Sequence, residues 1–157
     1  MKILKNLTLA ALTAVAVPLM FQTSTMLAGD HGRQGDHGPR HITFQKCLVA
    51  DSGPFGGHFE GTVAGECGAG TVVFNYLSVL AETPIVRFAG EYAITAPDCS
   101  FKAVCGGFVD TRTGHIELNG VVTEGPNLGD RVQVRAQLNT TGTCSHGTIA
   151  IMPIERE

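Results

Sequence analysis

Five cysteines and a histidine-rich segment are the residues of this 157-residue chain whose types and spacing could do chemistry. The cysteines are Cys47, Cys67, Cys99, Cys105 and Cys144. No CxxC motif occurs, and the separation of Cys99 from Cys105 is too wide for a zinc knuckle. Disulfide formation is therefore the expected chemistry, and the odd number of cysteines leaves one thiol free or joined to another molecule.

The first 28 residues indicate an oxidising destination for these cysteines. Lys2 and Lys5 precede an uninterrupted run of apolar and small residues, 7–17, which Pro18 ends. This is the layout of a secretory signal peptide over residues 1–28, and the run is too short to span a membrane. We expect cleavage after Ala28 and a secreted or periplasmic protein with no stable membrane insertion, in a compartment where disulfides form. The alternative is an uncleaved amphipathic anchor.

Residues 29–41, GDHGRQGDHGPRH, form a segment with no apolar residue except Pro39. Such a segment buries nothing, so we expect a flexible arm. Cleavage after Ala28 would place Gly29, Asp30 and His31 at the new terminus, where an amine, two backbone amides and an imidazole supply four nitrogens. Cu(II) and Ni(II) prefer tetragonal nitrogen sites of this kind. The alternative is a plain spacer whose histidines bind nothing, and then no cofactor is expected.

Beyond residue 41 the sequence is rich in Val, Thr, Phe, Ile and Gly, a composition typical of strands and tight turns. The expected strands are 42–50, 58–63, 71–80, 85–95, 101–109, 115–123, 131–138 and 147–152. The segment 71–80 is more apolar than alternating, so it is either buried on both faces or partly helical. About eight short strands without a long helix predict an all-β, antiparallel barrel of roughly eight strands over residues 42–157, with a β-sandwich as the alternative.

Alternation is clearest in 131–138, where it predicts that Val132, Val134 and Leu138 lie in the core and Arg135 in solvent. Several glycines lie inside the expected strands, where they fit tight curvature at barrel corners. These are Gly90, Gly106, Gly107 and Gly120. The alternative for them is bulges in a sandwich.

Two stretches, VRFAGEYAI at 86–94 and GGFVDTRTGHIELNG at 106–120, carry a resemblance to known proteins. They resemble strand-and-turn patterns in small secreted β-barrels of the allene oxide cyclase and dirigent type. The resemblance covers about the last hundred residues and implies an eight-stranded antiparallel barrel with an apolar interior. No catalytic residue of those families matches a position in this sequence, and a bacterial family of secreted barrels describes the pattern equally well.

Barrel closure bears on how the cysteines pair. The first and last strands of a closed barrel are neighbours, which predicts a disulfide between Cys47 and Cys144. Cys99 and Cys105 flank a short segment and are expected to close a small loop, which leaves Cys67 as the free thiol. The alternative pairs Cys67 with Cys99 or with Cys105.

Four charged residues are candidates for a ligand site. His58 and Glu60 share one strand face, and Arg87 and Glu91 share another. Facing inward, they would form a polar pocket or an acid–base pair. Facing outward, which the rarity of buried charge favours, they would be surface residues, with Arg87 and Glu91 as an exposed ion pair. The sequon at Asn139 is a candidate glycan acceptor.

Composition and motifs narrow the function. With 14 acidic and 11 basic residues, the chain is not built to hold phosphate backbones, so no nucleic acid partner is expected. No P-loop, zincin or serine-hydrolase motif occurs. The sequence favours a non-enzymatic barrel that binds a small apolar ligand or a partner surface. The alternatives are a cyclase or isomerase and a copper- or nickel-handling arm. A polar cavity would favour the enzyme, and a filled apolar interior the binding protein.

Overall fold

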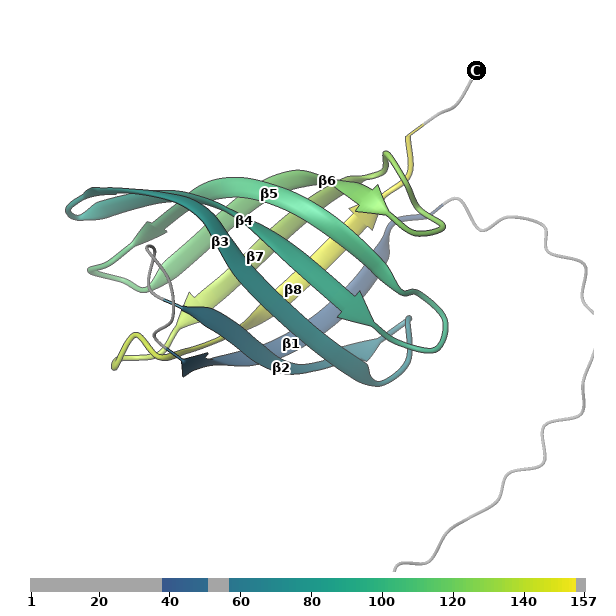
Figure 1. The fold of residues 1–157 in the computed structure, drawn as a ribbon, viewed down its shortest axis with the longest axis horizontal. Helices are drawn as coiled ribbons and strands as arrows, with labels where there is room; N and C mark the ends of the chain where they lie inside the picture. Colours follow the sequence, from purple (N-terminus) through teal and green to yellow (C-terminus); the bar gives the residue numbers. More distant parts are fainter. Residues whose placement is uncertain (1–37, 51–56, 155–157) are drawn as a thin grey trace, which may run out of the picture. The chain divides into compact units, whose positions relative to one another are not determined.

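The computed structural model describes residues 38–50 and 57–154, which form eight strands and no helix (Figure 1). The strands are β1 (Arg40–Ala50), β2 (His58–Gly65), β3 (Gly70–Glu82), β4 (Ile85–Thr95), β5 (Phe101–Asp110), β6 (His115–Glu124), β7 (Arg131–Leu138) and β8 (Cys144–Met152). Each strand pairs antiparallel with the next, and β8 pairs with β1, so the sheet closes into a barrel. The predicted eight-stranded barrel is confirmed, and the sandwich alternative is wrong. The expected signal peptide and residues 29–37 of the expected arm lie outside the described residues.

Alternation of side chains along each strand separates the core from the outer face. In β7, Val132 and Val134 are buried and Arg135 is exposed, as the sequence predicted. Leu138 is an exception, because it is only half-buried against the core. It is the last residue of β7 and borders the exposed turn that follows, so fewer neighbours cover it.

Barrel closure also extends β1 and β8, the two strands whose pairing, which we call the seam, closes the barrel. β1 begins at Arg40, so Arg40 and His41 belong to the barrel and not to the preceding arm. β8 begins at Cys144, three residues before the expected start. These added residues pair across the seam, Arg40 with Ile151 and Cys47 with Cys144, and their backbone groups are satisfied there.

β3 departs most from expectation. The segment is neither helical nor buried on both faces, because Leu77 is 51% and Leu80 is 56% exposed. The register gives the reason: β2 pairs with β3 only as far as Asn75, whereas β4 continues to Glu82. Beyond Asn75, β3 therefore has no paired residue in β2, whereas β4 stays paired with β5 as far as Ile85.

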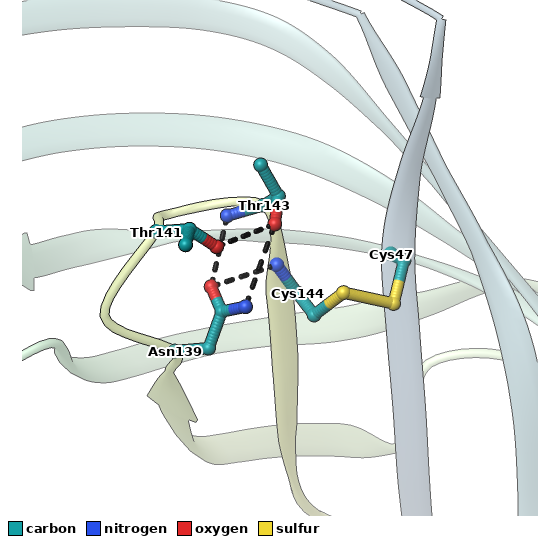
Figure 2. Close-up of a disulfide and its surroundings, with 5 residues drawn as sticks. All are labelled: Cys47, Asn139, Thr141, Thr143 and Cys144. Atoms are coloured by element: carbon teal, nitrogen blue, oxygen red, sulfur yellow. Dashed lines mark hydrogen bonds between the residues drawn. A yellow bond between two sulfur atoms is a disulfide. The ribbon is translucent and has the colours of Figure 1, made fainter.

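The seam disulfide joins Cys47 of β1 to Cys144 of β8, with the two Cα atoms 4.0 Å apart, and confirms the predicted pairing. Figure 2 shows the β7–β8 turn beside it. There the Asn139 side-chain oxygen accepts hydrogen bonds from the backbone N–H groups of Thr143 and Cys144, at 2.9 and 3.0 Å. The Asn139 amide nitrogen donates to the Thr143 hydroxyl at 3.4 Å. A glycan on this sequon would replace one of the two hydrogens on that nitrogen.

The second disulfide joins Cys67 to Cys99, so the expected Cys99–Cys105 loop and the free Cys67 are wrong. Cys67 lies in the β2–β3 connection and Cys99 in the β4–β5 connection, at one end of the barrel, which we call the Cys67 end. Cys105 lies inside β5, four extended residues beyond Phe101. At about 3.3 Å per residue this is roughly 13 Å of strand, which puts Cys105 beyond the reach of a disulfide with Cys99.

Two glycines inside strands, Gly90 in β4 and Gly106 in β5, offer a matched test of the interior packing. Gly90 is buried, and a Cβ there would overlap the ring of Phe74. Gly106 is exposed, and a Cβ there would lie 3.8 Å from its nearest neighbour, the carbonyl oxygen of Phe88. We expect Gly90→Ala to lower the free energy of unfolding by about 1–3 kcal/mol and Gly106→Ala to change it by about 0.5 kcal/mol or less, measured by urea titration. Equal losses would contradict this packing.

Candidate functional site

The most unusual residue of the barrel is Lys46, which the sequence reasoning did not single out. It lies on the inward face of β1 with Ile42, Phe44 and Leu48, and it is only 5% exposed. Lysine is almost never buried without a partner, because removing an ammonium from water is strongly unfavourable. The alternation of β1 contained this signal, since Lys46 occupies an apolar position of the strand.

Four aromatic rings surround the ammonium of Lys46. They belong to Phe74, Tyr92, Phe59 and Phe44, whose centroids lie 3.8, 4.7, 5.0 and 5.8 Å from Nζ. We call these four rings the aromatic cage. A ring face attracts a cation within about 6 Å, so the cage offsets part of the unfavourable free energy of burying the charge.

Burial shifts the pKa values of the groups around the cage. It lowers the pKa of Lys46 to about 7, against a smaller opposing effect of Cys105. It raises the pKa of the Cys105 thiol to about 12, against the opposing charge of Lys46. Burial also raises the pKa of Tyr92 well above its ordinary value, with Cys105 and Tyr76 adding to the rise. Near neutral pH, Lys46 is therefore the group of this set that changes charge.

Three polar side chains meet in this part of the interior: Lys46, Tyr92 and Ser145, which pairs opposite Lys46 in the β1–β8 register. Their Nζ, Oη and Oγ atoms make no hydrogen bond or ion pair with any described residue. In the same part of the chain, no fully enclosed side-chain nitrogen or oxygen lacks a hydrogen-bond partner. These three atoms therefore retain contact with solvent-sized space.

The two ends of the barrel differ in how completely they are filled. At the Cys67 end, Cys67 and Cys99 are 1% and 2% exposed, so the disulfide that joins them is buried. At the opposite end the apolar side chains that pack on the core are only half-buried. They are Leu48, Tyr76, Val79, Val109 and Leu138. The side chains at this opposite end are packed less closely than those at the Cys67 end. A molecule would therefore reach Lys46 most easily by entering from this opposite end.

The four charged residues expected as ligand-site candidates lie on the outer face. His58 and Glu60 contact each other there at 3.2 Å, with side chains 31% and 54% exposed. Arg87 and Glu91 do not form the expected ion pair in the described part of the chain. Residues four apart on a strand are separated by about 13 Å, which is too far for direct contact. These residues face away from Lys46.

A concavity lies on the outside of β1, β2 and β8. It measures about 350 Å³ and is lined by Thr43, Phe44, Gln45, Thr62, Val63, Ala64 and His146. Every polar residue that lines it is exposed. The groove therefore lacks the desolvated polar group that distinguishes the interior, which makes the interior the stronger candidate.

The expected copper or nickel ligands, Gly29, Asp30 and His31, lie outside the described residues. Within residues 38–50 and 57–154, no three His, Cys, Asp or Glu side chains gather closely enough to hold a metal ion. No helix in this part of the chain has the length and apolarity needed to cross a membrane.

Comparison with family models, curated proteins and solved structures finds no match to the chain.

The disulfide pattern predicts one free thiol per chain, Cys105, which is buried. Because only the thiolate reacts readily and burial raises the pKa of Cys105 to about 12, a thiol reagent such as Ellman's should not label the native protein at pH 8. In denaturant without reductant, one thiol should react, and Cys105→Ala should remove it. Labelling of five thiols would contradict both disulfides.

The buried lysine also predicts a pH dependence of stability. The pKa of Lys46 falls from an ordinary 10.5 to about 7 on folding, so between these values the unfolded chain binds more protons. Stability should therefore rise as the pH increases from 7 to 9, by up to about 1.4 kcal/mol per pH unit. Above pH 9, ionisation of Cys105 in the unfolded chain opposes this rise. Urea titrations should show the rise in the native sequence but not in Lys46→Met, and equal pH profiles would contradict the burial of the amine.

Proposed function

We propose that this protein is a secreted, non-enzymatic barrel that binds a small apolar ligand in its interior, beside Lys46. The observation that carries the proposal is the aromatic cage around a buried ammonium that pairs with no acidic side chain of the described residues. Ligand sites are typically apolar and aromatic cavities with a small number of polar groups that fix the orientation of the ligand. An eight-stranded barrel is wide enough either to be filled by its own side chains or to hold one small molecule.

Secretion is the part of the proposal that rests on the leader-like start and the disulfides. The first 28 residues have the layout of a signal peptide, and the two disulfides are compatible with an oxidising compartment. Neither feature depends on the ligand. In an oxidising compartment the two disulfides stay intact and stabilise the barrel that would hold the ligand.

Binding is favoured over catalysis by the composition of the interior. Apart from Lys46, Asp130, Ser145 and the hydroxyl of Tyr92, the buried side chains of the described residues are apolar. Asp130 lies at the start of β7, at the Cys67 end, and His58 and Glu60 face outward. A cyclase or isomerase acting by proton transfer would require an acid and a base tuned to different pKa values at one site. Among the described residues around the cage, Lys46 is the one whose pKa lies near neutrality.

Binding of 2-naphthamide, a small neutral aromatic molecule, tests the proposal. The chain contains no Trp, so the fluorescence anisotropy of the naphthyl group can be followed directly. The anisotropy should rise on addition of the mature protein, because the bound probe tumbles more slowly. No rise with protein at about 1 mM, where even a weak site would be half-occupied, would contradict the proposal.

A matched pair of variants distinguishes the interior from the surface. Phe59 is a cage residue, whereas Phe108 lies on the outer face of β5 against His115. Phe59→Ala should weaken binding by roughly tenfold, and Phe108→Ala should leave it unchanged. Circular dichroism checks that both variants fold, and Phe59→Leu provides a milder change if Phe59→Ala does not. Equal weakening by the Phe59 and Phe108 variants would place the probe elsewhere.

A further inference from the structure

The buried ammonium of Lys46 has no acidic partner in the described part of the chain. The ion pairs there join His58 to Glu60, Lys102 to Glu124 and Arg112 to Asp110. An unpaired charge removed from water destabilises a protein strongly, and apolar side chains of similar volume are usually better tolerated at such a position. Packing alone therefore gives no reason for a lysine among four rings.

The polar atoms that accompany Lys46 are of one chemical kind. The ammonium offers three N–H donors and no acceptor, and each hydroxyl of Tyr92 and Ser145 can donate one O–H. The residues are 5%, 2% and 3% exposed, and their polar atoms make no hydrogen bond with described residues. A group that only accepts hydrogen bonds and carries negative charge complements such a set, and charge-assisted hydrogen bonds are the strong ones.

We infer that the ligand of this barrel is an apolar acid, whose carboxylate pairs with Lys46 inside the barrel while its apolar body lies against the aromatic rings. The inference rests on the proposed function and names the chemical class of its ligand. The carboxylate supplies a counter-charge that Lys46 lacks among the described residues, and Tyr92 and Ser145 lie in the same interior, where they can donate to its remaining lone pairs. The half-buried apolar residues Leu48, Tyr76 and Val79 cover the side from which the body of the ligand would enter.

Binding of an anion to Lys46 should depend on pH through Lys46 itself. The other titratable groups on the inward faces are Cys105 on β5, Tyr92 on β4 and Tyr76 on β3, and burial raises the pKa of each, so they stay neutral between pH 6 and 9. On β2 and β8, His58, Glu60 and His146 face outward. The remaining inward residues of β6 and β7 are apolar, and Asp130 lies at the far, Cys67 end.

The test compares 2-naphthoate with 2-naphthamide, which have the same ring system and differ in charge. At pH 6 we expect the native protein to bind 2-naphthoate at least about tenfold more tightly than the amide. Between pH 7 and 9 the affinity for 2-naphthoate should fall by up to about tenfold per pH unit, because an increasing fraction of Lys46 must take up a proton to pair with the anion. The affinity for the amide should not change.

Lys46→Met is the decisive variant, because it keeps a flexible side chain of similar length and removes the charge. It should abolish the preference for 2-naphthoate and its pH dependence while retaining binding of 2-naphthamide. Equal affinities for the two probes in the native protein, or a preference that survives in Lys46→Met, would overturn the inference and leave the proposed function standing. Failure of both probes to bind would overturn the proposed function together with the inference. The pH profile of the native protein tests the inference even if the variant does not fold.

Discussion

The pairing of β1 with β8 is the constraint on which the rest of this structure depends. Without it the sheet would have two open edges, and strand alternation would separate two faces but enclose nothing. Closure turns one face into an interior, and the inward residues Ile42, Phe44 and Lys46 of β1 then each have a paired neighbour on both sides. It places Ser145 beside Lys46 and brings Cys47 against Cys144, so the seam carries both a covalent bond and part of the candidate site.

Lys46 and the aromatic cage show how the interior of this barrel differs from an ordinary core. Most of the buried side chains are apolar and gain from leaving water, whereas the ammonium loses its hydration and regains only part of that free energy from the rings. The resulting pKa near 7 places the amine between its two charge states at neutral pH. Stability and binding then make opposite demands: folding alone favours the neutral amine, and an acidic ligand favours the ammonium.

The sequence predicted the fold because the signals that define it are local. Strict alternation gave the inward and outward faces of β4, β6 and β7, and the chain order gave the Cys47–Cys144 pair once closure was assumed. The errors lie where long-range register decides the outcome. The overhang of β3 depends on where β2 begins, and the partner of Cys99 depends on which connections share an end of the barrel. Lys46 was overlooked because charged residues were assigned to the surface by type, although its position in β1 is an apolar one.

Because Arg40 pairs with Ile151, the first strand starts where the last one ends, and the order of strands around the wall has no natural beginning. Each strand keeps the same two neighbours wherever the chain is cut. A short peptide bridging residues 154 and 38 would make the backbone a ring, and any tight turn, such as the one between β5 and β6, could then carry the new ends. The strand order of the barrel is thus circular, and the same topology is compatible with chain ends placed in a different turn.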